Sequence, residues 1–300
     1  MIDSQILAKI ADLELVARIV VDGLVSGLHR SPFHGYSAEF SQYRRYRPGD
    51  DLKYVDWKLV ARTDRVYTKQ FRETTNMAAS LVVDTSASMS FSASAHRTPD
   101  VRLQTGASHV SKFRYAQILA AALAHLIATQ GDGVGLVARD RFLPPRTGRH
   151  HLRALLASLS AMKTAGDWHA PDVVRRAAER LTRRGLLIVL SDLYDTEDRV
   201  FVELRRAARM GHEIVLFHVM SRDEIEFPYA SDVEFADLET GGIVAVNGRE
   251  ARRSYLDAVA AFLERWRTRA GSEAFQYSLV ITDTPPDAAL RKFLLSRQEK

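Results

Sequence analysis

The segment LVVDTSASMSF, residues 81–91, places three oxygen-bearing side chains at alternate positions directly after an apolar run. Asp84 ends the run, and Ser86 and Ser88 follow it. Carboxylates and hydroxyls are oxygen ligands, and Mg²⁺ takes six such ligands, usually with several waters among them. The three residues therefore form a candidate site for a hard divalent cation, Mg²⁺ or else Mn²⁺ or Ca²⁺. The alternative is a structural turn in which Asp84 and the serines bond only the backbone.

A second apolar run, LLIVLSD at residues 186–192, also ends in a carboxylate, that of Asp192. In open α/β sheets, ligands bind beyond the carboxyl ends of the central strands, where the strand order reverses. In the common order 3-2-1-4-5-6, the first and fourth strands are neighbours at that point. We therefore expect Asp84 and Asp192 to face one spot, although more than a hundred residues separate them.

The pattern around these two runs alternates between strands and helices, which predicts an α/β fold with a doubly wound, mostly parallel sheet. The predicted strands are residues 80–84, 133–138, 141–146, 186–192, 213–220 and 275–282. The predicted helices are residues 113–131, 151–162, 170–185, 199–212 and 251–270. One segment breaks the alternation, since residues 232–250 have the pattern of a hairpin around Gly241-Gly242.

The N-terminal part of the chain differs in composition from the rest. Residues 5–30 show a helical apolar period, and residues 31–50 are rich in Gly, Pro, Tyr and Arg. We expect a helix and a small β-rich module in 1–75, followed by the α/β domain in 76–300. Trp57 and Phe71 are expected to be buried between the module and the domain.

Composition excludes several classes of chemistry. The chain has 300 residues, a net charge of +5 and no cysteine, so disulfides, thiolate catalysis and zinc–thiolate sites are excluded. No apolar run is long enough to span a bilayer, and the N-terminus lacks the pattern of a signal peptide. We therefore expect a cytoplasmic protein without a transmembrane segment.

Two motifs carry a resemblance to known families. DTSASM, followed after two more strand–helix units by LLIVLSDL, resembles a von Willebrand factor A domain with its metal-ion-dependent adhesion site. The upstream block resembles the signature of the family called domain of unknown function 58, and the two together cover nearly the whole chain. The matching positions of the block are His34, Gly35, Glu39, Phe40, Arg44, Tyr46, Gly49, Asp50, Asp51, Asp56, Trp57, Ala61, Arg62, Lys69 and Phe71.

The A-type resemblance implies one further ligand, a threonine from the loop before the helix that precedes the Asp192 strand. Trp168 occupies the place where that threonine is expected, between Asp167 and His169. Either Asp167 substitutes as the oxygen donor, or the site binds metal only weakly. The candidate ligands are Asp84, Ser86, Ser88, Asp192 and Asp167.

The resemblance also implies a function. Members of the family are linked to AAA+ ATPases of the MoxR type, which implies a non-enzymatic adaptor or chaperone-like protein for the ATPase or a client. The bound cation would engage a carboxylate of the partner. We assign no catalytic residues.

Two other functions stay open. A metal-dependent hydrolase, a phosphatase or nuclease, would use Asp84 and Asp192 with Asp167 or His169 as the general base. Nucleic-acid binding would use the Arg, Lys and Tyr residues of 43–65, and we do not expect it, because four acids within that run neutralise much of its charge.

Overall fold

The computed structural model describes most of the chain. The described residues are 7, 11–25, 38–47, 55–63, 65–73, 77–92, 110–181, 184–194, 198–238 and 241–298.

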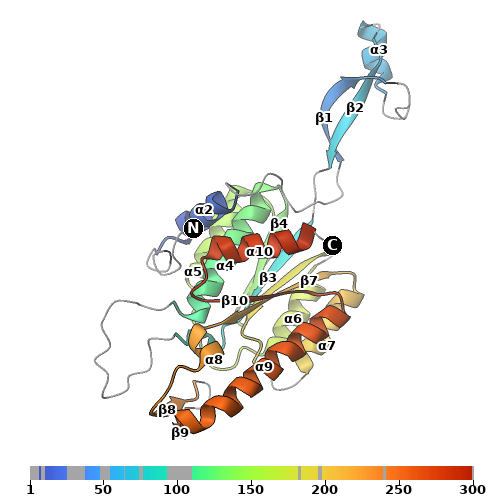
Figure 1. The fold of residues 1–300 in the computed structure, drawn as a ribbon. Helices are drawn as coiled ribbons and strands as arrows, with labels where there is room; N and C mark the ends of the chain where they lie inside the picture. Colours follow the sequence, from blue (N-terminus) through green and yellow to red (C-terminus); the bar gives the residue numbers. More distant parts are fainter. Residues whose placement is uncertain are drawn as a thin grey trace.

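A six-stranded sheet with the order β10-β7-β6-β3-β4-β5 forms the centre of the molecule (Figure 1). Its strands are β3 (Ala78–Val83), β4 (Gly133–Ala138), β5 (Arg141–Arg146), β6 (Gly185–Ser191), β7 (Glu213–Met220) and β10 (Gln276–Ile281). All neighbours are parallel except β5, which runs antiparallel to β4. If the six strands are renumbered 1 to 6 in chain order and read from β5, the strand order is 3-2-1-4-5-6, as predicted. The first and fourth of them, β3 and β6, are neighbours where the order reverses.

Helices cover both faces of this sheet (Figure 1). One face carries α2 (Leu13–Val25), α4 (Lys112–Thr129), α5 (Arg149–Ser160) and α10 (Pro286–Gln298), which share one hydrophobic core. The other carries α6 (Ala170–Glu179), α7 (Arg199–Arg209) and α9 (Gly248–Ser272), which share a second. Because both faces are covered, the central strands are mostly apolar, and all seven residues of β6 are buried.

The N-terminal helix α2 packs on the main core rather than on the β-rich module. Val16 and Leu24 are fully buried in the cluster that includes α4 and α10. The guanidinium of Arg291 donates to the carbonyl of Gly23 over 2.9 Å, which joins α2 to α10. The described contacts of α2 therefore lie with the α/β core.

The β-rich module consists of β1 (Ala38–Arg45) and β2 (Tyr67–Glu73), paired antiparallel, with α3 (Trp57–Thr63) between them in sequence. Figure 1 shows it extending away from the body of the molecule. The carboxylate of Asp56 accepts from the backbone N–H groups of Lys58 and Leu59, both at 3.1 Å, and so caps α3.

Our expectation that Trp57 is buried is wrong. Trp57 is the first residue of α3 after the Asp56 cap, and 62% of its surface is exposed. The other residues of α3 are not buried either. The burial of Phe71 lies outside what the structure describes.

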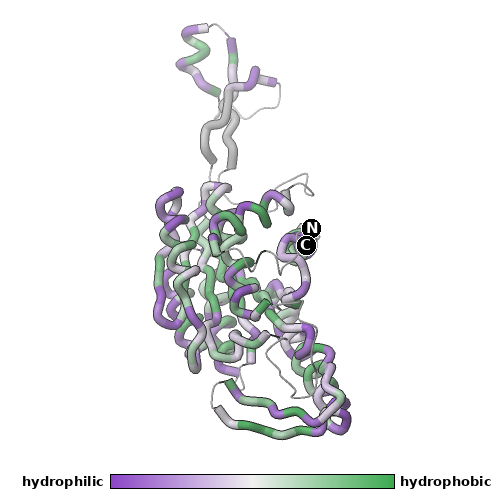
Figure 2. Tube along the Cα trace, turned by 90° about the vertical axis from the view of Figure 1, so that its left-hand side faces the viewer, coloured by the Kyte–Doolittle hydropathy of each residue, from purple (hydrophilic) through white to green (hydrophobic). Residues whose placement is uncertain are grey.

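The predicted hairpin is present at the far end of the molecule, where β8 (Asp232–Ala236) pairs antiparallel with β9 (Ile243–Asn247). A short helix, α8 (Arg222–Glu226), precedes it, and α9 follows it directly. Figure 2 shows hydrophobic residues along this hairpin as well as inside the body. Ile243 and Val244 are exposed. Within the described ranges, no helix is both long and apolar enough to cross a membrane.

Candidate metal centre and adjoining cavity

Asp84 lies at the carboxyl end of β3 and is almost completely buried. Its backbone N–H donates to the carbonyl of Leu190 in β6 over 3.0 Å. One carboxylate oxygen, Oδ1, accepts from the N–H of Ser86 at 2.7 Å, and the other, Oδ2, accepts from the hydroxyl of Ser191 at 2.5 Å. The carboxylate of Asp84 therefore bonds the backbone of the turn that follows it, as the structural-turn alternative predicts.

The hydroxyl oxygens of Ser86 and Ser88 lie 2.9 Å apart at the start of the 3-10 turn η2 (Ala87–Ser90). In an octahedral Mg²⁺ site with ligands at about 2.0–2.1 Å, adjacent ligand oxygens are also about 2.9 Å apart. The two hydroxyls are hydrogen-bonded to each other, and their spacing equally suits two neighbouring ligands of one cation.

Asp192 follows β6 and is held differently, by an ion pair. The ammonium of Lys112 lies 2.8 Å from Oδ2 of Asp192 and 2.6 Å from Oε1 of Glu224, with the lysine side chain only 1% exposed. The other oxygen of Asp192 accepts from the N–H of Tyr194 at 3.3 Å. Burial alone lowers the pKa of Lys112, but the two carboxylates outweigh it, so the pKa is raised and the lysine stays charged.

Sequence reasoning missed Lys112, although one signal was available. Lys112 is the first residue of α4, directly after the Ser111 cap. A cation there opposes the helix dipole, whose N-terminal end is positive. A lysine at such a position therefore indicates a nearby anion that outweighs the dipole, and here the anions are Asp192 and Glu224.

The two aspartates interact electrostatically across the β3–β6 boundary. The pKa of Asp84 is raised to about 7, first by burial and second by the negative charge of Asp192. The hydrogen bonds from Ser191 and Ser86 lower it and offset only part of this rise. The carboxylate of Asp192 therefore lies near enough to Asp84 for its charge to act on it.

The side chain of Asp167 does not face this edge. It is 65% exposed and pairs with His169, with 3.1 Å between Oδ2 and Nδ1. Its loop does lie against the Asp84 turn, because Gly166 accepts from Ala87 and Thr85 accepts from Ala165, each over 2.9 Å. Trp168, in the place expected for a threonine, points into the apolar core below.

Three of the five candidate ligands, Asp84, Ser86 and Ser88, therefore lie in one turn, and the charge of Asp192 acts on Asp84. Asp84, Ser86 and Ser88 offer the carboxylate and hydroxyl oxygens that a hard cation takes, and Asp192 lies beside them with one oxygen bonded to Lys112. In the described part of the chain, no three Asp, Glu, His or Cys side chains are grouped so that they could hold a metal ion. The donor chemistry fits a cation bound largely by hydroxyls and water, with few carboxylates.

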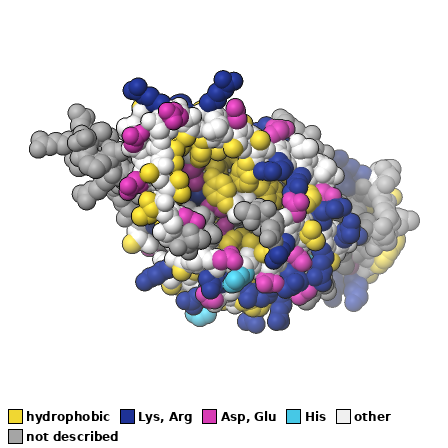
Figure 3. Space-filling model, turned by 90° about the horizontal axis from the view of Figure 1, so that it is seen from below, with side chains coloured by type: hydrophobic (Ala, Val, Ile, Leu, Met, Phe, Trp, Pro, Cys, Tyr) yellow, Lys and Arg dark blue, Asp and Glu magenta, His cyan; other side chains and the backbone are white. Residues whose placement is uncertain are grey.

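A cavity of about 1,370 Å³ opens from this edge toward the hairpin. Ser88 and Lys112 line its inner end, and β8 with α8 and α9 forms the opposite wall. Figure 3 shows it as a hollow in the lower face, with hydrophobic side chains inside and acidic ones among and around them. Its aromatic lining consists of Phe91, Tyr194, Phe227, Tyr229, Phe235 and Tyr255.

Glu224 links the cavity to the aspartates. Its Oε1 accepts from Lys112 and its Oε2 accepts from the N–H of Ser221, which begins α8 in a capping box. Burial and the nearby carboxylate of Glu224 raise the pKa of Tyr194. The hydroxyl of Tyr255 donates to the backbone carbonyl of Glu224 over 3.0 Å.

Comparison with known families gives one match over most of the chain. The family described as "Protein of unknown function DUF58" matches residues 42–264.

The relatives found by sequence are mycobacterial. The uncharacterized protein Rv1480 of Mycobacterium tuberculosis strain H37Rv is 29% identical over 248 residues, covering 80% of this chain and 73% of its own. The uncharacterized protein Mb1516 of Mycobacterium bovis matches with the same identity and the same coverage.

Solved structures with a similar arrangement include two from Bacteroides. The conserved hypothetical protein BatB of Bacteroides thetaiotaomicron is 14% identical with a TM-score of 0.45, over 75% of this chain and 100% of its own. An aerotolerance-related membrane protein of Bacteroides fragilis is 16% identical, with the same TM-score and coverage.

Proposed function

Because this chain belongs to the DUF58 family, we propose that it is a non-enzymatic protein-binding module with a fold of the von Willebrand factor A type. In this proposal, the sheet edge formed by Asp84, Ser86, Ser88 and Asp192 binds a divalent cation, with Mg²⁺ as the first choice. A partner protein contacts that edge through a carboxylate.

The observation that carries the proposal is the electrostatic state of Asp84. Its carboxylate is buried beside that of Asp192, and its pKa is raised to about 7, so ionising it costs free energy in the metal-free protein. A cation next to Asp84 would remove this cost, and the hydroxyls of Ser86 and Ser88 supply adjacent oxygens at a suitable spacing. The adjacency of β3 and β6 supports the same arrangement.

Each side chain has a separate part in this arrangement. Ser86 and Ser88 would bind the cation directly, Asp84 would balance its charge, and Asp192 would contribute through its oxygen that Lys112 does not bind. When bound, the cation supplies an open coordination position for an incoming carboxylate oxygen. Ser88 is also a lining residue of the cavity, so a partner bound at the edge lies next to the end of the cavity that Ser88 and Lys112 line.

The exposed position of the candidate general bases favours binding over hydrolysis. Asp167 and His169 pair with each other, and both side chains are more than half exposed. A general base must lie within hydrogen-bond reach of the attacking water, and these two exposed side chains contact each other instead. A partner of the MoxR type, or a client of such an ATPase, is proposed from the family resemblance.

Partner binding in the presence and absence of the cation tests the proposal. The full chain would be immobilised and a MoxR-type ATPase from the same genome passed over it in Mg²⁺ or in EDTA. We expect Asp84→Ala and EDTA to weaken binding by similar factors, and their combination to add little, because both remove one interaction. Asp167→Ala is the matched control, since it removes a carboxylate from the neighbouring loop.

Two results would overturn the proposal. Binding that is insensitive both to EDTA and to Asp84→Ala would exclude the ion-dependent edge as the contact. Hydrolysis of phosphatase or nuclease substrates with Mg²⁺ or Mn²⁺, abolished by Asp84→Ala, would show an enzyme instead.

A further inference from the structure

The cavity has a charge opposite in sign to that of the whole chain. The chain carries a net charge of +5. Among the described residues that line the cavity, however, five are acidic and one, Lys112, is basic. The acidic residues are Asp223, Glu224, Asp232, Glu234 and Asp237. Since Lys112 is already paired with Asp192 and Glu224, the cavity presents a negative potential to a ligand.

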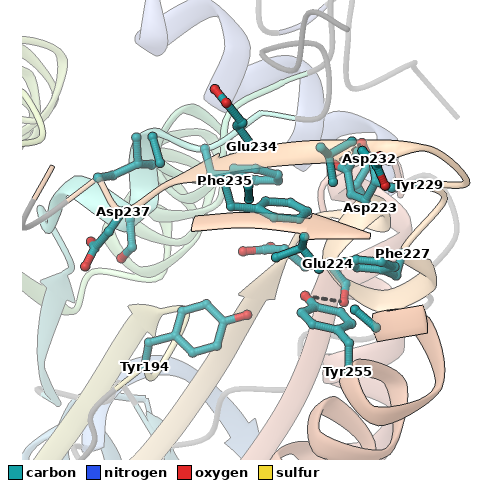
Figure 4. A pocket seen from close by; sticks show the side chains of 18 of the residues that line it. Tyr194, Asp223, Glu224, Phe227, Tyr229, Asp232, Glu234, Phe235, Asp237 and Tyr255 are labelled. Carbon is teal, nitrogen blue, oxygen red and sulfur yellow. Dashed lines mark hydrogen bonds between the residues drawn. The ribbon is translucent and has the colours of Figure 1, made fainter. Parts of the chain in front are cut away.

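Aromatic rings form the wall between these acids. The ring of Phe227 lies 4.5 Å from that of Tyr255 and 5.1 Å from that of Tyr229, and Tyr229 lies 5.4 Å from Phe235, all measured between centroids. Figure 4 shows these rings on the cavity side of β8 and α8. Aromatic faces together with carboxylates are the groups that bind lysine ammonium and arginine guanidinium ions.

The inner end of the cavity already binds one such cation from the chain itself. The ammonium of Lys112 lies 4.9 Å from the ring centroid of Tyr194 and contacts two carboxylates. The same combination of ring and carboxylate recurs further out, where Tyr229 donates to Asp223 over 3.4 Å beside Asp232 (Figure 4).

The volume of the cavity sets the size of its ligand. Sites for small molecules and cofactors measure about 300–1,000 Å³, and this cavity exceeds that range. Its lining also includes apolar side chains between the acids, among them Val233, Leu238 and Val246 on the hairpin. An extended stretch of polypeptide with both basic and apolar side chains matches this volume and lining.

We infer that the cavity binds an extended, basic segment of a partner protein, in which Arg or Lys side chains alternate with apolar ones. This inference rests on the proposed role as a protein-binding module and adds the chemistry of the bound segment. It involves a different contact from the ion-dependent edge: the ion would engage a carboxylate, whereas the cavity engages cations.

Binding of a synthetic peptide tests this inference without the natural partner. The probe is a fluorescein-labelled octapeptide of alternating Leu and Arg, and the comparison peptide alternates Leu and Glu. Fluorescence anisotropy with the full chain in 1 mM EDTA would report both affinities. We expect the basic peptide to bind at least tenfold more tightly than the acidic one.

Charge-neutralising variants locate the peptide. Asp223→Asn combined with Asp232→Asn should weaken the basic peptide at least tenfold, because both groups lie beside Tyr229 in the cavity (Figure 4). Glu234→Gln is the control on the same strand as Asp232: it removes one charge where the double variant removes two, and its carboxylate points away from the rings in Figure 4, so we expect less than a twofold change. Asp237→Asn, at the other end of β8, serves if the double variant unfolds, and it should weaken the peptide at least threefold.

Several outcomes would overturn the inference. The first is equal affinity of the chain for the two peptides. The second is an equal loss of affinity in Glu234→Gln and in the double variant. The third is loss of peptide binding in EDTA, because that result would place the peptide at the ion site. Peptide binding that persists in EDTA and in Asp84→Ala supports it, even if the ion-dependent partner contact fails. A dimer in sedimentation that the double variant dissociates would assign the cavity to a second copy of this chain and overturn the partner assignment.

Discussion

Two buried aspartates lie at the same edge of the sheet, and the protein stabilises them in different ways. We call Asp84 with Ser86, Ser88 and Ser191 the Asp84 half, and Asp192 with Lys112 and Glu224 the Asp192 half. In the Asp84 half, the carboxylate accepts hydrogen bonds from the backbone N–H of Ser86 and from the hydroxyl of Ser191, both neutral donors. In the Asp192 half, the carboxylate is bonded to a buried ammonium.

The difference indicates where an external cation can act. A buried carboxylate costs free energy unless a charge or several hydrogen bonds compensate it. Lys112 supplies that charge for Asp192, whereas the pKa of Asp84 remains raised to about 7. The Asp192 half is therefore the structural part of the edge, and the Asp84 half is the part that gains most from a bound ion.

The largest effect is expected from breaking the Asp192 half. Lys112→Met removes the cation and leaves Asp192 and Glu224 buried without it, which should lower the free energy of unfolding by about 3–5 kcal/mol. Urea denaturation followed by circular dichroism measures this change. The control is Arg222→Ala, which removes a surface cation that pairs with Asp283 and should cost at most about 1 kcal/mol.

A double variant sharpens this prediction. Adding Asp192→Asn to Lys112→Met removes one of the two uncompensated charges, so part of the lost stability should return. If Lys112→Met costs no more than the Arg222 control, the ammonium does not stabilise the buried carboxylates, and the contrast between the halves is lost.

The next effect concerns the Asp84 half and its ion. Mg²⁺ at a hundredfold excess over its dissociation constant should stabilise the folded chain by about 2.7 kcal/mol, because it binds only the folded state. Differential scanning fluorimetry over a Mg²⁺ titration measures the shift in Tm. Asp84→Ala should abolish the shift. A variant that responds to Mg²⁺ as the wild type does would show that the ion binds elsewhere.

In the absence of metal, the pH dependence of the free energy of unfolding should report the raised pKa of Asp84. Because the pKa of Asp84 is about 7 in the folded state and near 3.9 when unfolded, its stabilising contribution is complete below about pH 4 and is lost as the pH rises through 7. The titration of Asp84 changes the free energy of unfolding by at most about 1.4 kcal/mol per pH unit. In EDTA, the stability of Asp84→Asn relative to wild type should therefore rise from pH 5 to pH 8.

The wild-type curve alone does not isolate Asp84, because His218 also makes the free energy of unfolding depend on pH. Burial lowers the pKa of His218 to about 4, so the stability it contributes is lost as the pH falls from 6.5 toward 4, which is the opposite slope. The two groups partly cancel in the wild type, and only the difference between wild type and variant isolates Asp84. Parallel curves for the two proteins between pH 5 and 8 would contradict the raised pKa.

The strand order and the meeting of the two aspartates were predictable from sequence because they depend on simple patterns. Apolar strands alternate with amphipathic helices, and each of two central strands ends in a carboxylate. Parallel strands at the reversal of order bring such ends together whatever their separation in sequence. The hairpin at 232–250 was predicted from its alternation and its glycines, and it is present.

The missed features depend on side-chain direction or on distant contacts, which spacing does not fix. Trp57 was expected to be buried because it is large and aromatic, but the Asp56 cap sets it at the start of α3 with its ring exposed. Lys112 finds its partners 80 and 112 residues further along the chain. Neither the distances nor the cavity between α8 and the hairpin follows from a local pattern.

The smallest expected effect is that of Asp167→Ala, which tests whether the neighbouring loop belongs to the Asp84 half. The side chain of Asp167 is 65% exposed and contacts His169, so its loss should change the free energy of unfolding by no more than about 0.5 kcal/mol. The Mg²⁺-induced shift in Tm should equal that of the wild type, and fluorimetry of both proteins in one titration measures it. The backbone of this loop nevertheless bonds Thr85 and Ala87 directly. A variant that loses the Mg²⁺ shift would therefore mean that the loop turns Asp167 toward the serines when the ion binds, and that the ion site has a fifth ligand.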